Sequence, residues 1–404
     1  MSKLLPDRRY RWLVVAYTVL LQAVSIGIVV YCFALFAVPW LESFDAPRRE
    51  VMLIISLLQI GVGIVSPLAG RALDTVPIRR LVVVGALLLG IGLWLASLAQ
   101  ALWQLVLVYA VVFPLTMTLA GTLTSQALVT RWFQDRRGMA IGISSMGTNL
   151  GGMVFPLLVA GWLAAMGWRA TMVQLAILSL ALIIPLGWLV LSRDPRPAGA
   201  DPAAASAAPP PARWTTRDIV TSPLFWIPVV GILPLNTAFG AVQFNLAAYA
   251  QDIGLSRDQA GGLIALSSFT MILGKLFFGS LGDRLDHRYL YWIAAGCMSS
   301  AMLILQSQPP LWLLVAGVLL VGLAGGGILP LLGVVFSARF GVAAFGRVMG
   351  LVMLVITFGA VGPLLAGWIY DATGSYDAAF LMFVLFFGPG VVLMRWLPEP
   401  AVAR

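Results

Sequence analysis

Residues 260–281, AGGLIALSSFTMILGKLFFGSL, form one apolar run that carries a single charged side chain, Lys275. A run of about 20 such residues is long enough to cross a bilayer as an α-helix. Lys275 lies eight residues before Asp283, where the run ends. At about 1.5 Å per residue this is roughly 12 Å inside the boundary, near the midplane of a core about 30 Å thick. A charge at that depth costs at least about 2.5–3.5 kcal/mol and usually faces an interior cavity. We expect Lys275 to bind an anion; the alternative is a structural lysine that bonds helix carbonyls.

The rest of the chain has the same apolar character. Its 404 residues are 60% hydrophobic and 10% charged, and the polar residues cluster between long apolar runs. Because lipid offers the backbone no hydrogen-bond partner, such runs indicate helices. The pattern predicts an all-α integral membrane protein with twelve spans, at about 11–40, 51–73, 80–99, 102–130, 138–164, 169–191, 222–250, 259–281, 289–307, 311–338, 344–369 and 378–397.

The basic residues predict the orientation of these spans. Twelve spans place both termini on one side, and that side receives all but five of the 25 Lys and Arg residues. By the positive-inside rule the rich side is cytoplasmic. The net charge of +9 therefore reflects membrane topology. We expect the protein to lie in a lipid bilayer and not to bind nucleic acid. The five exceptions are Arg48, Arg49, Arg169, Arg257 and Lys275.

One hydrophilic stretch, residues 192–221, divides the spans six and six, and its Pro and Ala content is typical of a semi-flexible linker. We therefore predict an N-terminal half at 1–191, a cytoplasmic linker at 192–221 and a C-terminal half at 222–404.

The two halves repeat each other. Asp74 follows span 2 and Asp283 follows span 8, at an offset of 209 residues. Arg131 ends span 4 and Arg339 ends span 10, at an offset of 208. A duplicated six-helix half is typical of transporters whose halves rock around a site at the midplane.

Six motifs stand out at the ends of the spans. They are Gly70…Asp74…Arg79-Arg80, Gly279…Asp283-Arg284…Arg288, RWFQDRRGMAIGI (131–143), YAQDIGLS (249–256), GKLFFGSLGDR (274–284) and FGRVMG…GPLLAGWIYDATGSYDAAF (345–380). The first resembles the loop 2–3 signature of the major facilitator superfamily, and the second resembles the other copy of that signature. The other four resemble the superfamily's bacterial branch of monocarboxylate transporters and oxalate:formate antiporters.

The resemblance implies two six-helix halves, alternating access, and a cation in span 8 that binds the substrate carboxylate. Lys275 stands where this family usually has arginine, which keeps the charge and loses the planar fork. The family's oxalate carriers add a second cation from span 11, whereas residues 350–369 contain none, which argues against a dianion. Met271 stands where eukaryotic monocarboxylate carriers often have an aspartate, so a proton-relay role for that position does not carry over.

The resemblance also implies that Asp74 and Asp283 lock a closed cytoplasmic face through helix N-terminal amides and nearby arginines. An anion at a helix N-terminus gains roughly 0.3–1 kcal/mol, and up to about 2 when partly buried, which suits a breakable gate. The alternative is that these are solvated loop charges. The arginines expected in this gate are Arg79, Arg80, Arg131 and Arg284.

Polar residues inside the spans are further candidates for contacting the substrate. Asn236 and Gln243 are seven residues apart and therefore share one helix face. Buried amides and hydroxyls also serve simply to hold helices together. We read the sole histidine, His287, as a surface residue. The candidates are Tyr31, Gln126, Asn149, Asn236, Gln243 and Asn245.

The sequence thus predicts a secondary transporter of a small organic anion, a monocarboxylate, coupled to a proton and working by alternating access. The chain contains no P-loop pattern and no nucleophile–base arrangement within the spans, so we expect neither an enzyme nor a cofactor. We expect a monomer in the bacterial inner membrane with both termini cytoplasmic. The alternatives are a carrier of a larger or neutral compound, such as a drug or siderophore, and a non-transporting membrane sensor.

Overall fold

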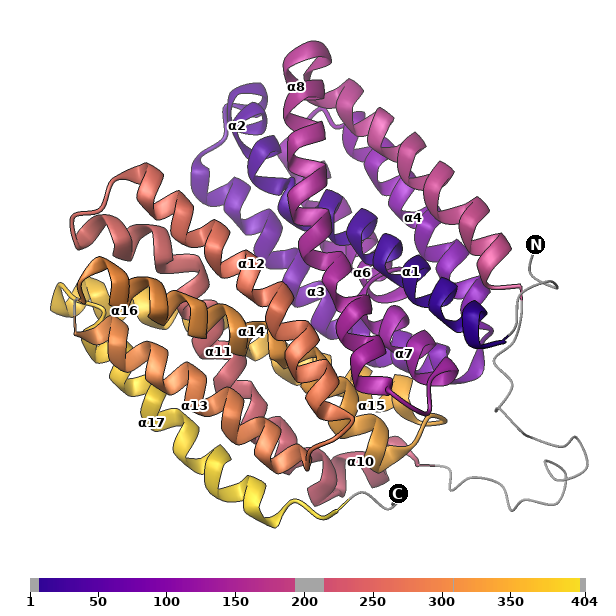
Figure 1. The fold of residues 1–404 in the computed structure, drawn as a ribbon. Coiled ribbons are helices and arrows are strands. Elements are labelled where there is room, and N and C mark those ends of the chain that lie inside the picture. The colour runs from indigo at the N-terminus through magenta and orange to yellow at the C-terminus, as the bar shows by residue number, and fades with distance from the viewer. Residues whose placement is uncertain (1–6, 193–213, 308, 400–404) are drawn as a thin grey trace, which may run out of the picture. The chain divides into compact units, whose positions relative to one another are not determined.

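The computed structural model describes residues 7–192, 214–307 and 309–399, and every regular element in them is helical (Figure 1). Eleven of the described helical segments are long and apolar enough to cross a membrane, so the predicted all-α membrane fold is confirmed. Most of the predicted linker lies outside the described residues. The α-helices are α1 (Asp7–Ile26), α2 (Phe33–Phe44), α3 (Arg48–Thr75), α4 (Ile78–Ser97), α5 (Leu102–Leu107), α6 (Phe113–Leu119), α7 (Thr122–Trp132), α8 (Arg137–Val190), α10 (Thr216–Thr221), α11 (Pro223–Asp252), α12 (Arg257–Gly282), α13 (His287–Gln306), α14 (Leu311–Phe340), α15 (Phe345–Ile356), α16 (Gly362–Thr373) and α17 (Asp377–Leu393).

Helix α8 accounts for the difference between eleven segments and the twelve predicted spans. Its 54 residues would extend about 80 Å at 1.5 Å per residue, far more than one bilayer core needs. Gly167 interrupts the helical backbone with φ 75° and ψ 173°, a conformation that glycine adopts without a Cβ penalty. The predicted fifth and sixth spans are therefore both present, joined at Gly167 without a loop.

Four other spans contain a short change of helix type. A π-helix, η2 (Gly27–Tyr31), separates α1 from α2, and a second, η3 (Val108–Val112), precedes α6. A 3₁₀ turn, η4 (Thr357–Val361), precedes α16, and another, η5 (Met394–Trp396), follows α17. Pro114 and Pro363 directly follow η3 and η4 in their spans, and proline removes a backbone donor at such points. Local changes of this kind are frequent at functional sites.

The described residues divide into two compact units. The first contains residues 7–134, 143–192, 214 and 340–354, and the second contains residues 135–142, 215–307, 309–339 and 355–399. Each unit therefore takes the short segment that opens one span of the other predicted half. The predicted division at the linker stays a prediction.

Within the first unit, glycines bring α8 into backbone contact with α1. A Cβ built on Gly147 or Gly151 would overlap the backbone of Val19 or Ala23. Small residues at helix interfaces allow this close approach in membranes. In the second unit, α11 packs against α12, α16 and α17, and α13 packs against α17. Gly367 on α16 is different, since a Cβ there would meet nothing within 4 Å.

Candidate functional site

Lys275 lies seven residues before the end of α12, and only 2% of its surface is exposed. Its backbone carbonyl is where a Cβ on Gly142 would fall, so the first turns of α8 touch α12 directly at the lysine. On the preceding residue, a Cβ on Gly274 would overlap the Leu323 backbone of α14. Two glycine contacts thus fix the backbone of α12 at the position of the buried cation.

The three α11 candidates have different partners. Gln243 accepts a 3.0 Å hydrogen bond from Ser267 Oγ of α12, two turns before Lys275. Asn236 lies beside η4, where its Nδ2 is 2.7 Å from a Cβ built on Gly359. Asn245 instead donates to the Ala241 carbonyl of its own helix at 2.9 Å, so part of its amide is used in packing.

The first unit holds the other three polar candidates. Tyr31 closes η2, is 41% exposed, and lays its ring against Gly152. Asn149 is buried, and its Oδ1 accepts a 3.1 Å bond from Thr148. Gln126 is fully buried, and neither its Nε2 nor its Oε1 has a hydrogen-bond partner among the described residues. A buried polar group left in this state costs about 1–3 kcal/mol and calls for an explanation.

Gln22 is a buried polar residue of α1 that our sequence analysis did not single out. Its Nε2 donates to the carbonyl of Ser144 at 2.8 Å and to the Ser144 hydroxyl at 2.9 Å. That hydroxyl in turn donates to Thr18 at 2.8 Å. The signal was present, since a lone glutamine in the apolar stretch of span 1 needs a partner in lipid.

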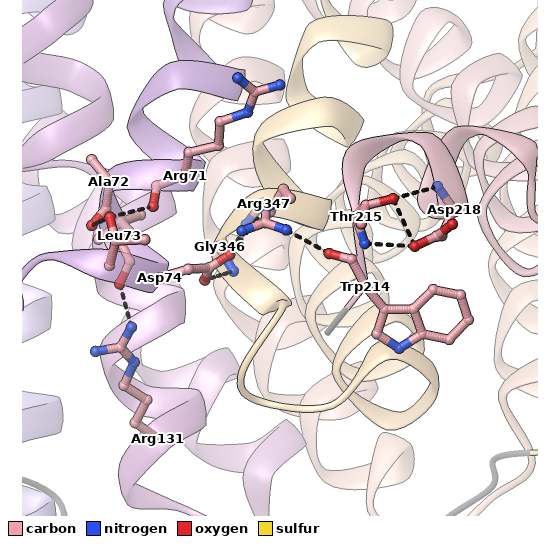
Figure 2. Close-up of polar contacts among 11 residues, drawn as sticks. Arg71, Ala72, Leu73, Asp74, Arg131, Trp214, Thr215, Asp218, Gly346 and Arg347 are labelled. Atoms are coloured by element: carbon pink, nitrogen blue, oxygen red, sulfur yellow. Dashed lines mark hydrogen bonds and ion pairs between the residues drawn. The ribbon is translucent and has the colours of Figure 1, made fainter. Parts of the chain in front are cut away.

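Asp74, at the end of α3, caps the N-terminus of α15 (Figure 2). Its Oδ1 accepts from the Gly346 amide at 3.0 Å, and its Oδ2 accepts from the Arg347 amide at 2.9 Å. The Asp74 side chain is only 4% exposed, and the Arg347 guanidinium lies 4.0 Å from it. Arg131 donates to the carbonyl of Leu73, which brings its charge next to the same carboxylate.

Asp283, which follows α12, caps the N-terminus of α8 in the same way. Its Oδ1 accepts from the Gly138 amide at 2.6 Å, and its Oδ2 accepts from the Met139 amide at 3.0 Å. Burial raises the pKa of the Asp283 carboxyl above its ordinary value, while the two amides and the nearby Arg137 and Arg136 act in the opposite direction.

Glycines repeat with the two caps. A Cβ on Gly346 would lie 2.6 Å from Asp74 Oδ1, and a Cβ on Gly138 would lie 3.1 Å from Asp283 Oδ1. Gly346 also faces the backbone of Gly70, and Gly138 faces that of Gly279. Both carboxylates therefore reach the helix amides only because no side chain stands between the two backbones.

The remaining arginines of the expected gate lie elsewhere. The Arg79 guanidinium lies 3.5 Å from the ring centroid of Trp188, a cation–π arrangement. Arg80 and Arg284 are exposed. Of the four arginines, Arg131 is thus the one that the structure brings beside a capping aspartate, through the Leu73 carbonyl.

The interpretation of His287 as a surface residue was wrong. It is 7% exposed, and its Nδ1 lies 2.9 Å from Nη1 of the buried Arg339. Arg339 also donates to the Pro398 carbonyl at 3.1 Å. Position in a short loop suggested exposure, but a charged residue at the end of span 10 needed a buried partner.

Comparison of the sequence with known proteins assigns this chain to a family. Residues 19–254 and 236–404 match the family described as the Major Facilitator Superfamily. The chain belongs to the major facilitator superfamily. It is 27% identical over 412 residues to monocarboxylate transporter 13 of Bos taurus, covering 98% of this chain and 91% of that protein. It is 23% identical to the MFS-type transporter YcxA of Bacillus subtilis, covering 95% and 94%.

Solved structures of the superfamily have the same fold. The human organic anion transporter MFSD10 superposes with a TM-score of 0.71 over 96% of this chain and 100% of that chain, at 16% identity. The predicted superfamily is therefore confirmed, and the chain is a multi-pass membrane transporter rather than an enzyme.

Proposed function

We propose that this transporter carries a small organic anion, a monocarboxylate, and that Lys275 binds its carboxylate. The observation that supports this most is the burial of one ammonium, 2% exposed, inside an apolar span. A buried charge is tolerated only when it is paired or serves a function. The relatives named monocarboxylate transporters support the same substrate class.

The charges of the spans suit one carboxylate better than two. Residues 350–369 of the span built from α15, η4 and α16 contain no Lys or Arg. Ser267 and Gln243, which are bonded to each other, are neutral groups of the same unit as Lys275. One cation, with no second Lys or Arg in residues 350–369, favours a monoanion. The residues that stay predictions as substrate contacts are Tyr31, Gln126, Asn149, Asn236, Gln243 and Asn245.

The two capping aspartates are proposed as the gate of an alternating-access cycle. Each carboxylate holds two backbone amides of a helix that belongs to the other predicted half. Hydrogen bonds to a charged group contribute about 1.5–3 kcal/mol, which is large enough to hold a state and small enough to be broken in each cycle. Arg131 is included in this gate, and Arg79, Arg80 and Arg284 stay predictions.

Proton symport is the proposed coupling. A buried positive charge is costly to carry through a low-dielectric medium, and a bound carboxylate neutralises it. For net uptake the empty carrier must return, and its return is easier when the charge of Lys275 is removed. A proton that travels on Lys275 or on the substrate meets this requirement.

We propose a monomer in the bacterial inner membrane with cytoplasmic termini, on the basis of the Lys and Arg distribution.

The experiment is binding and uptake by purified protein. A thermal-shift screen of acetate, pyruvate, lactate and benzoate identifies a binder, because a ligand of the folded state raises the apparent stability. Its labelled form is then followed into proteoliposomes. Lys275→Ala should abolish both binding and uptake while the unliganded melting temperature is kept, and Lys275→Arg should retain part of the activity. Unchanged affinity in Lys275→Ala would contradict the proposal. If the protein binds a neutral drug-like compound and none of the carboxylates, the alternative of a carrier for larger or neutral compounds is favoured. If a carboxylate binds but is not taken up, a non-transporting sensor is favoured.

A further inference from the structure

Arg347 connects the Asp74 cap to Trp214, which lies near the end of the predicted linker at residues 192–221 (Figure 2). Its backbone amide bonds Asp74, its Nε lies 4.0 Å from Asp74 Oδ2, and its Nη1 donates to the carbonyl of Trp214 at 2.5 Å. All three residues belong to the first unit. The Arg347 guanidinium is therefore shared between the Asp74 carboxylate and the Trp214 carbonyl, which are 140 residues apart in the chain.

The Trp214 carbonyl is held in place from both sides. The Trp214 indole meets the ring of Phe340, at the end of α14, edge to face at 4.9 Å. The next residue, Thr215, starts α10 with a capping box: Asp218 N donates to Thr215 Oγ1 at 3.2 Å, and Thr215 N donates to Asp218 Oδ2 at 2.8 Å. A ring contact before the carbonyl and a helix cap after it leave Trp214 little freedom, so its oxygen is a fixed acceptor for Arg347.

The second copy of the cap has a different residue at the position of Arg347. Met139 occupies the third position of α8, as Arg347 occupies the third position of α15, and the two are offset by 208 residues. A thioether carries no charge and no N–H donor, so it can neither pair with Asp283 nor hold a carbonyl. Asp74 is also the more buried of the two carboxylates: only 4% of its side chain is exposed, whereas Asp283 is only partly desolvated.

We propose that Arg347 and Trp214 are positioning residues of the Asp74 gate, through which the end of the linker restrains the opening of that gate. This inference rests on the proposed function, because it requires Asp74 to act as a gate. When α15 leaves Asp74, Arg347 must give up the carboxylate, the Trp214 carbonyl, or both. Met139 cannot supply this restraint at the Asp283 gate, so this contribution to the closed state comes from the first copy of the repeat.

Two substitutions separate this connection from the cap itself. Arg347→Met gives the first copy the residue that the second copy already has, and it leaves both amide bonds to Asp74 in place. Trp214→Ala keeps the carbonyl but removes the ring contact that fixes it, whereas Trp214→Phe keeps an aromatic ring against Phe340. Arg217→Met, on the exposed surface of α10, is the matched control for loss of an arginine near the linker.

The reporter is the rate at which a maleimide labels Val348→Cys in a background with Cys32→Ala and Cys297→Ala. Val348 is fully buried and follows Arg347, so its labelling measures how often the N-terminus of α15 is released. Arg347→Met and Trp214→Ala should each raise the rate at least about twofold, because each variant loses or loosens one hydrogen bond that holds the closed state. Trp214→Phe and Arg217→Met should leave it near the parent rate.

Asp74→Ala in the same reporter distinguishes the two proposals. If Asp74→Ala speeds labelling but Arg347→Met and Trp214→Ala do not, the gate stands and the role of the linker is refuted. If Asp74→Ala has no effect, the gate itself is refuted. If Trp214 has only a structural role, Trp214→Ala and Trp214→Phe should both lower the melting temperature and should label Val348→Cys at equal rates. That result also contradicts the inference.

Discussion

Asp74 and Asp283 each bind the second and third amides of a helix N-terminus, at the same register. Asp74 accepts from Gly346 and Arg347, and Asp283 accepts from Gly138 and Met139. A carboxylate at this position satisfies orphan N–H groups and favours the positive end of the helix dipole. The repeat has therefore preserved a pair of contacts and not merely a pair of acidic residues.

Asp74→Ala should release the N-terminus of α15, because both acceptors are lost while the two amides stay buried. We expect labelling of Val348→Cys to rise about tenfold, from the loss of bonds to a charged group worth at least about 1.5 kcal/mol. Asp252→Ala serves as the control, since Asp252 is an exposed residue at the end of α11. An equal rise in the control variant would show that labelling reports general loosening.

Gly346→Ala and Gly138→Ala should weaken the same caps by steric overlap. The added Cβ would fall against Asp74 or Asp283 and against the facing glycine backbone. Overpacking of this kind costs about 1–3 kcal/mol, so the melting temperature should fall and labelling should rise. Gly367→Ala is the matched change at a site with open space. Equal melting temperatures for the variants at 346 and 367 would argue against the tight contact.

Gln126→Leu should keep or raise the melting temperature, because neither polar atom of this buried amide has a described partner. Removing an unsatisfied buried group is often neutral or stabilising. Gln22→Leu, which loses two bonds to Ser144, should instead destabilise the protein. If Gln126 contacts the substrate, its leucine variant will also bind the substrate several-fold more weakly. A stable Gln126→Leu variant with parent affinity would remove Gln126 from the site.

The stability of the parent protein relative to Asp283→Asn should depend on pH. Burial raises the pKa of Asp283 in the folded state above the ordinary value of about 4. Between the two pKa values the folded state therefore holds a proton that the unfolded state has lost. The associated stability is present below the ordinary pKa and is lost as the pH rises through the folded value. The difference in melting temperature should shift towards the parent on acidification from neutral pH to about pH 4. A difference independent of pH would mean that the carboxyl is not desolvated.

Exchange of labelled for unlabelled substrate should be faster than net uptake, because the loaded site is neutral and the empty site carries a charge. Net uptake should respond to an inward pH gradient and be nearly insensitive to membrane potential for a monoanion. Initial rates in proteoliposomes under a pH gradient and, separately, under a valinomycin-set potential measure both. A response to potential without a response to pH would rule out symport.

Much of the architecture could be predicted because lipid leaves the backbone few choices. Apolar runs of about 20 residues had to be helices, and the repeat of Asp74 and Asp283 indicated two related halves. The join at Gly167 could not be predicted, because a backbone angle rather than a polar loop separates the two spans.

The candidate site was less predictable, because burial and partners depend on tertiary packing. The position of Lys275 near the membrane midplane could be predicted from its distance to the end of the span. The contacts of a long flexible side chain such as that of Arg79 could not. Arg79 was expected beside Asp74 and lies on Trp188, whereas Arg347 was overlooked and lies beside Asp74. Comparing the two copies position by position would have pointed to Arg347, because Met139 stands in its place.

The reversal of the chain at Gly167 has a mechanical consequence. The rest of α8 continues on both sides of this one residue, so the two spans meet at an elbow with no slack. A change in the angle between the two spans therefore has to be made through the backbone angles at or beside Gly167, because no loop residues stand between the two helices to absorb it.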